Sequence, residues 1–280
     1  MSYVRPQNLP DLLTRADQAL AQARTKGPNR WHADEHEGGG QLALPAERWR
    51  TLLTEAVQGG RLSLAFYPVV QRDPKLALHQ EGVIRLRLDN NGQLLSAGDF
   101  MPMAASLNLT APIDLGVVQL AIEHLGKGSG DVAVNLSAET IADFGFRNRL
   151  VQLLQGYPQL CPRLLFEVPE YGVYKRFDAF CALVRSLKTL GCRVGIEYFG
   201  QQFASNGKLT SVGLDYIKVH PSFVRGVSLN PGNQEFLRGL CTMAHALGIT
   251  VIAQGVEQAE DLPLLAQLGF DGATGPGVVG

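Results

Sequence analysis

The sequence predicts an α/β fold, specifically a (β/α)8 barrel, because strand-like apolar runs alternate with helical stripes and end in polar residues. Strands that alternate with helices are typical of a parallel sheet, and seven or eight such units fit a barrel. A doubly wound sheet is the alternative, but no GxGxxG turn follows the first strand to favour it. The predicted strands are 62–70, 82–88, 132–137, 163–169, 193–199, 215–220 and 250–256, with a weak eighth near 271–275.

Apolar residues at helical spacing predict the helices. One stripe, with Trp49 and Leu53, follows Pro45, a residue suited to the first turn of a helix, and ends at Gly59-Gly60. A second stripe covers 177–187 and stops at Gly191. A third covers 236–247, from Phe236 through Leu240 and Met243 to Leu247, and stops at Gly248. A glycine just past the last apolar position is a common helix stop.

The N-terminal part is organised differently. Residues 8–31 form one more apolar stripe, followed by the polar, glycine-rich segment HADEHEGGGQ. Because a single helix cannot form a core, residues 1–33 are predicted to be the tail of another domain. Residues 34–60 are then a linker with a connecting helix, and residues 61–280 are the barrel. A plain N-terminal extension is the alternative.

Composition excludes several classes of protein. With 25 basic and 26 acidic residues the net charge is −1, which gives no overall attraction to DNA or to an anionic membrane. None of the four cysteines has CxxC spacing, so neither a zinc site nor a disulfide framework is indicated. No apolar run approaches the roughly 20 residues that cross a bilayer, and the N-terminus lacks a signal-peptide core. A cytoplasmic location is expected, although a longer parent protein can still be membrane-bound.

Polar residues stand at the strand ends, where a barrel of this kind carries its site. Asn135 alone could cap a turn, Glu167 could pair with Arg163 or Lys175, and Lys218 could be a solvated strand end. Their joint placement instead predicts one convergent rim whose oxygen ligands suit Mg²⁺ or Mn²⁺. The set comprises Glu81, Asn135, Glu167, Glu197, Lys218, Gln254 and Thr274.

Eight short motifs in order carry a family resemblance. They read YPVV, EGVIR, VNLS, FEVPE, EYFG, IKVH, AQGVE and TG. This order resembles the EAL domain family of cyclic di-GMP phosphodiesterases, whose motifs run YQPI, EALLR, NLS, ExTE, DDFG, KxD, AEGVE and QG. The stretch LLTRADQALAQARTKGPNRW resembles the final helix of a GGDEF domain. The chain is therefore similar to the C-terminal part of a GGDEF–EAL tandem protein, and most similar to the LapD-like receptors, a degenerate, membrane-anchored group.

The resemblance implies roles for matching residues. Arg85 stands where the family contacts a ligand phosphate, with an ion pair to Glu81 or Glu167 as the alternative. Phe100 lies where a family segment runs close to the ligand, with a buried helix anchor as the alternative. The implied metal-ligand positions are Glu81, Asn135 and Glu167; Lys218 stands at the position that holds the attacking water, and Glu257 in a loop that meets the ligand.

The departures from the family pattern matter most for function. Glu197-Tyr198 replaces the two aspartates of DDFG, His220 replaces the aspartate of KxD, and Gln254 replaces the first glutamate of AEGVE. A phenol with a pKa near 10 cannot stand in for a metal-bridging carboxylate, and an amide cannot act as a base. Binding positions depart too, at Tyr67, Gly82-Val83 and Thr274. The sequence therefore predicts a degenerate phosphodiesterase without a two-metal centre.

Loss of catalysis does not require loss of binding. The intact motifs bring six carboxylates to the rim; here Glu81, Glu167 and Glu197 remain. Fewer like charges ease binding of a dianion, so the leading hypothesis is a cyclic di-GMP receptor that needs neither Mg²⁺ nor Mn²⁺. The predicted binding residues are Arg85, Glu81, Asn135, Glu167, Lys218, Gln254, Glu257 and Phe100. A residual phosphodiesterase and a dimerisation or docking module that binds no nucleotide are the alternatives.

The resemblance also implies partners and a location. EAL barrels commonly form homodimers through the segment after DDFG, here QQFASNGKLT. The expected partners are cyclic di-GMP, a second copy of the chain, and the chain's own GGDEF and membrane-proximal domains. A LapD-like protein would in addition bind a periplasmic protease and so control biofilm adhesion. This chain would then be the cytoplasmic portion of an inner-membrane protein.

Overall fold

The computed structural model describes residues 44–71, 76–88, 93–128, 130–201 and 212–278. The chain falls into two compact units. The first combines residues up to Ser63 with Ile84–Ile113, and the second combines Leu64–Val83 with Asp114–Gly280. The predicted domain tail, residues 1–33, and the segment 202–211, which contains most of the predicted dimer contact, lie outside the described residues. No described helix is long and apolar enough to cross a membrane.

The first unit contains helix α2 (Ala46–Gln58), strand β3 (Leu94–Ser96) and helix α3 (Ala97–Ser106). The predicted stripe of α2 is confirmed, since Trp49, Leu53 and Ala56 are buried. Strand β3, which the sequence analysis did not predict, pairs antiparallel with the end of β2, Arg85 opposite Ser96. Ser96 then caps α3 in a reciprocal arrangement with Asp99.

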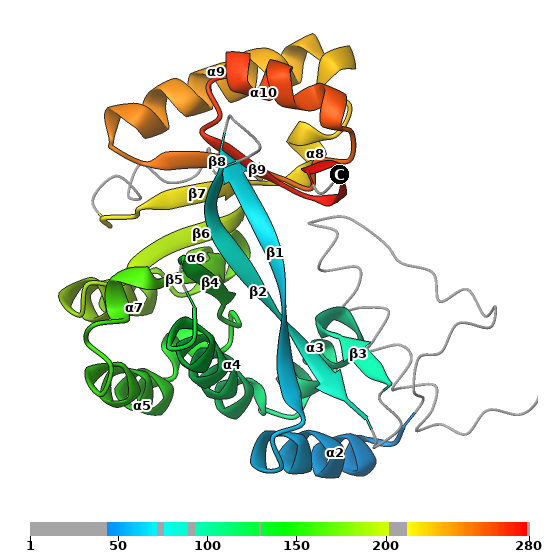
Figure 1. The fold of residues 1–280 in the computed structure, drawn as a ribbon, viewed down its shortest axis with the longest axis vertical. Helices are drawn as coiled ribbons and strands as arrows, with labels where there is room; N and C mark the ends of the chain where they lie inside the picture. Colours follow the sequence, from blue (N-terminus) through cyan, green and yellow to red (C-terminus); the bar gives the residue numbers. More distant parts are fainter. Residues whose placement is uncertain (1–43, 72–75, 89–92, 129, 202–211, 279–280) are drawn as a thin grey trace, which may run out of the picture. The chain divides into compact units, whose positions relative to one another are not determined.

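The second unit is a closed barrel (Figure 1). Its strands follow the order β1-β9-β8-β7-β6-β5-β4-β2, and pairing of β1 with β2 closes the ring. The predicted weak strand near 271–275 is confirmed as β9. The strands are β1 (Leu62–Gln71), β2 (Ala77–Arg87), β4 (Val132–Asn135), β5 (Leu164–Pro169), β6 (Arg193–Phe199), β7 (Tyr216–Val219), β8 (Thr250–Gln254) and β9 (Gly272–Thr274).

Strand β1 corrects the prediction of an all-parallel sheet. It pairs antiparallel with β9, with Val70 opposite Ala273. The neighbouring pairs β2–β4, β4–β5, β5–β6, β6–β7, β7–β8 and β8–β9 are all parallel. The reason is the short connection, residues 72–76, between β1 and β2. A parallel crossover needs a dozen or more residues, whereas an antiparallel return needs only a turn.

Among the described residues, helices follow strands β4, β5, β7 and β8, the alternation typical of a (β/α)8 barrel. Helix α7 buries Phe180, Val184 and Leu187 of its predicted stripe, whereas Phe177 and Cys181 of that stripe are half-buried and Leu183 is buried in addition. In α9 the prediction is partly wrong, because Met243 and Leu247 are exposed while Leu237 is buried in their place. The helices of this unit are α4 (Thr110–Leu125, from Asp114 onward), α5 (Phe144–Gln155), α6 (Glu170–Lys175), α7 (Phe177–Thr189), α8 (Pro221–Val224), α9 (Pro231–Ala246) and α10 (Leu262–Leu268).

An apolar layer fills the barrel interior. It consists of Val69, Ala133, Leu165, Tyr216 and Ile252, with Leu78 packed against it. Side chains two residues apart on a strand point to the same side. Residues 135, 167, 218 and 254, each two positions after a member of this layer, therefore form the next layer toward the C-terminal ends of the strands.

Candidate functional site at the C-terminal rim of the barrel

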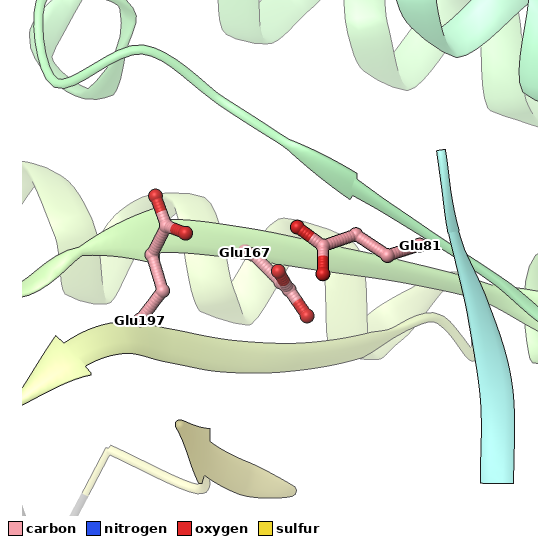
Figure 2. A group of neighbouring side chains, drawn as sticks. All are labelled: Glu81, Glu167 and Glu197. Atoms are coloured by element: carbon pink, nitrogen blue, oxygen red, sulfur yellow. The ribbon is translucent and has the colours of Figure 1, made fainter. Parts of the chain in front are cut away.

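Strand register brings the predicted polar residues to one end of the barrel. Asn135 lies opposite Glu167, and Gln254 lies opposite Thr274. Figure 2 shows Glu81 of β2, Glu167 of β5 and Glu197 of β6 reaching toward one another. Each offers a carboxylate oxygen within 4.8 Å of the others.

Lys218 lies at the centre of this layer. Its Nζ donates to Glu167 Oε2 at 2.6 Å and to Glu81 Oε2 at 2.9 Å. The side chains of Lys218 and Glu167 are fully buried. The alternative readings of Lys218 as a solvated strand end and of Glu167 as a partner of Arg163 are therefore wrong. Arg163 instead donates to backbone carbonyls, among them Gly128 O and Gly130 O.

The Lys218 ammonium is shared by the carboxyl groups of Glu81 and Glu167, and the pKa values of these two groups shift in opposite directions. Burial is the largest single influence and would raise the pKa of Glu81, but the charge of Lys218 together with hydrogen bonds from Lys218 and Asn135 lowers it overall. The pKa of the fully buried Glu167 is raised by burial against the pull of Lys218. Burial alone would lower the pKa of Lys218, yet the charges of Glu167 and Glu81 raise it. The ammonium therefore stays charged and is shared by Glu167 and Glu81.

Glu197 is the neutral member of the group. Burial, followed by the charge of Glu167, raises its pKa to about 8. Amide groups surround it. Gln254 hydrogen-bonds to its side chain, and Asn135 Nδ2 lies 3.2 Å from Glu197 Oε2 and 3.1 Å from Glu167 Oε2 in one orientation of the amide. In the other orientation the same nitrogen donates to Glu81 Oε1 at 3.3 Å.

Tyr198, next to Glu197, has an unusual backbone. Its φ is +55°, in the left-handed region that residues other than glycine, asparagine and aspartate rarely adopt. Gln254 Oε1 accepts from the Tyr198 N–H at 3.2 Å. The ring lies 5.8 Å from that of His220, tilted by 58°, and the side chain stays exposed. Three positions that depart from the family motifs, 198, 220 and 254, are therefore linked to one another by contact.

Three buried residues beneath and beside the rim were missed by the sequence analysis. Tyr216 donates from its hydroxyl to Glu167 Oε1 at 2.9 Å. His79 lies 3.9 Å from the same oxygen, and burial lowers its pKa to about 3. Glu170 accepts from the N–H groups of Gly200 and Gln201, each at 3.1 Å, and so fixes the turn after β6. Tyr216 was detectable, because it lies two positions before Lys218 on the same strand and so shares its face.

The remaining predicted residues make other contacts. Glu257 is half-exposed and forms an ion pair with Arg225, another residue that sequence reasoning missed, at 2.9 Å. Arg85 and Phe100 belong to the first unit. There, Arg85 Nη1 donates to Ile84 O at 3.0 Å, and Phe100 is fully buried in α3, as its alternative reading as a helix anchor predicted.

The rim does not fit the metal pair that the family motifs imply. The three glutamates supply one group of hard oxygen ligands suited to a single Mg²⁺. An ion there would have to displace the Lys218 ammonium from Glu81 and Glu167 and remove the proton from Glu197. Among the described residues no second group of three carboxylate, imidazole or thiol ligands is present. The described residues thus offer one candidate ligand group at the rim, whereas two-metal chemistry uses two ions about 4 Å apart.

Sequence comparison with known proteins shows which family and which relatives the chain resembles. The family model described as "EAL domain" matches residues 50–278. The cyclic di-GMP phosphodiesterase PdeF of Escherichia coli is 27% identical over 69% of this chain and 26% of its own length. The cyclic di-GMP phosphodiesterase PdeB of Shewanella oneidensis is 24% identical over 96% of this chain and 32% of its own length. The chain thus spans about a quarter to a third of these relatives.

Solved structures agree with the barrel. A LapD fragment of Vibrio cholerae with S helix, GGDEF and EAL parts, bound to c-di-GMP, has a TM-score of 0.86 at 23% identity over 98% of this chain and 67% of that one. This likeness concerns the fold. The FimX EAL domain of Pseudomonas aeruginosa bound to c-di-GMP has a TM-score of 0.75 at 26% identity over 83% of this chain and 95% of that one. With the motif order and the barrel register, these matches show that the chain belongs to the EAL domain family.

Proposed function

We propose that this EAL domain is a cyclic di-GMP receptor that does not hydrolyse its ligand. The observation that carries the proposal is the charge balance at the rim. Lys218 pairs with Glu81 and Glu167, and the pKa of about 8 keeps Glu197 protonated near pH 7. One ammonium and one protonated carboxyl thus offset two of the three rim carboxyl charges without a metal ion, so the repulsion that an anionic ligand meets is reduced.

The same groups disfavour hydrolysis. Two-metal cleavage of a phosphodiester requires two ions that clamp the attacking and leaving oxygens. Tyr198 and His220 stand where the family motifs carry aspartates, and Gln254 stands where they carry the glutamate assigned to water activation. Because an amide cannot accept a proton at neutral pH, no base replaces that glutamate at position 254. We infer that neither Mg²⁺ nor Mn²⁺ is required for binding.

Ligand contacts are proposed from the motif positions. Arg85 is the first candidate for a phosphate contact, since its guanidinium fork matches phosphate oxygens. The further candidates are the rim residues Glu81, Asn135, Glu167, Lys218 and Gln254, together with Glu257. Phe100 is not retained as a contact, because its side chain is fully buried. The FimX EAL domain, 26% identical to this chain and bound to c-di-GMP, supports the choice of ligand. The phosphodiesterases PdeF and PdeB support the second candidate function, a residual phosphodiesterase.

The wider role is a proposal that rests on the likeness to LapD in fold. In that role the chain forms a homodimer and couples to GGDEF and membrane-proximal domains of a longer inner-membrane protein. Residues 1–33 would be the end of such a GGDEF domain. Ligand binding would then control capture of a periplasmic protease, and hence biofilm adhesion. A module that docks without nucleotide is the alternative.

An affinity comparison between two arginine variants tests the proposal. Arg85→Ala should weaken cyclic di-GMP binding at least about tenfold, because a charge-assisted phosphate contact contributes about 1.5–3 kcal/mol. Arg87→Ala is the matched control, since Arg87 is exposed two positions further along the same strand. No binding by the unaltered chain would favour the docking module, and equal affinities of the two variants would remove Arg85 from the site.

A further inference from the structure

The substituted positions 198, 220 and 254 form one connected group at the rim, here called the Tyr198 group. Gln254 Oε1 holds the backbone N–H of Tyr198, and the ring of His220 lies beside the phenol ring. His220 is itself fixed, because its Nδ1 accepts from the N–H of Ser222 at 3.0 Å as the cap of α8.

Tyr198 is also strained. A tyrosine at φ +55° is disfavoured relative to an ordinary backbone, and asparagine and aspartate tolerate that conformation better. Such outliers persist where the surrounding structure holds them, and they gather at functional sites. Here Gln254 holds the N–H of Tyr198, and Glu170 holds the two N–H groups of the following turn. The structure thus maintains an exposed ring in an unfavourable backbone at the mouth of the barrel.

An ordinary phenol has a pKa near 10, so Tyr198 keeps its proton at physiological pH and its exposed hydroxyl can donate a hydrogen bond. An aspartate at this position would present negative charge to the rim, whereas a phenol presents an O–H. Phosphate oxygens accept strong hydrogen bonds from such donors.

We propose that Tyr198 is a ligand-specificity residue whose hydroxyl donates a hydrogen bond to a phosphodiester oxygen, with Gln254 and His220 as positioning residues. Where the family motif has an aspartate that would hold a metal cation, the Tyr198 group then offers a neutral hydroxyl that donates to the anionic phosphodiester. This inference rests on the proposed function, and it names the residue that makes metal-free binding of a phosphodiester favourable.

Two matched pairs of variants test the donor in EDTA, with cyclic di-GMP as the probe. Tyr198→Phe removes only the hydroxyl and should weaken binding at least about tenfold; Tyr157→Phe, a tyrosine at the end of α5 away from the rim, should bind like the unaltered chain. Tyr198→Asp and Tyr198→Asn are alike in size and both tolerate the left-handed backbone. The aspartate should bind at least about tenfold more weakly than the asparagine, because it adds a like charge.

A double-mutant cycle tests the positioning role. Gln254→Ala should weaken binding in the unaltered chain but have little further effect once Tyr198 is phenylalanine, because both changes remove the same contact. If the unaltered chain binds and Tyr198→Phe binds as well as Tyr157→Phe, the donor role is overturned while the receptor stands. If the unaltered chain does not bind in EDTA, the proposed function fails and this inference fails with it.

Discussion

Lys218 Nζ lies 2.6 Å from Glu167 Oε2, and neither side chain is exposed to solvent. Strands β5 and β7, separated by β6 in the barrel, supply the two groups. Removing one partner of a buried ion pair leaves an uncompensated charge, which is far more costly than losing an exposed pair. The site is therefore a structural element of the barrel as well as a candidate binding surface.

Lys218→Met should lower the free energy of unfolding by about 3–5 kcal/mol, because Glu81 and Glu167 lose their shared cation. Urea denaturation measures the change. Lys188→Met is the control, since Lys188 pairs with Asp215 at the surface and exposed pairs contribute about 0–1 kcal/mol. Similar losses in the two variants would show that the central pair does not stabilise the barrel.

Gly195→Ala should destabilise the barrel by about 1–3 kcal/mol through overpacking. A Cβ at position 195 would lie 2.5 Å from the buried ring of Tyr216, whose hydroxyl donates to Glu167. Gly239→Ala is the control, because it lies within α9 and a Cβ there meets no atom within 4 Å. That change should stabilise by about 0.5–1 kcal/mol. Thermal unfolding should show a lower Tm for Gly195→Ala and a higher Tm for Gly239→Ala than for the unaltered chain. An undiminished Tm of Gly195→Ala would refute the close packing.

The raised pKa of Glu197 predicts a pH dependence of stability. The unfolded chain loses this proton above the ordinary value of 4.5, whereas the folded protein keeps it until about 8. Unfolding therefore releases a proton between these values, so this group's contribution to stability falls as pH rises through that window, by up to about 1.4 kcal/mol per unit.

Glu197→Gln removes that titration, so its stability relative to the unaltered chain should increase between pH 5 and pH 8. Urea denaturation at the two pH values measures the difference, which cancels the contribution of Asp114, another buried carboxyl with a pKa raised to about 7. A constant difference between the two proteins would mean that Glu197 is ionised in the fold.

Restoring the acidic positions should restore metal binding. A variant with Glu197→Asp, Tyr198→Asp, His220→Asp and Gln254→Glu should have a lower Tm than the unaltered chain in EDTA, because like charges gather at the rim. Mn²⁺ should raise that Tm by several degrees, since a ligand at about 100 times its Kd stabilises by about 2.7 kcal/mol. The unaltered chain should show the same Tm with and without Mn²⁺; a clear rise would show that it binds the ion.

The rim residues were predictable because the ends of parallel strands meet at one edge, so one polar residue per strand forms a layer. The hydrogen bonds and ion pairs among these residues were not predictable. The partners of Lys218 lie 51 and 137 positions away in the sequence, and the sequence does not fix which carboxyl takes the shared proton. The direction of β1 followed from the short connection 72–76, a length cue that the alternation of elements obscured. The left-handed backbone of Tyr198 has no sequence signal beyond the neighbouring Gly200.

The most direct test of a non-hydrolysing receptor is calorimetric titration with cyclic di-GMP in EDTA, followed by chromatography of the recovered nucleotide after incubation with Mg²⁺ or Mn²⁺. The account predicts saturable binding in EDTA and intact cyclic nucleotide in every sample. Binding that needs Mg²⁺ or Mn²⁺, or conversion to the linear dinucleotide once either ion is present, would contradict it.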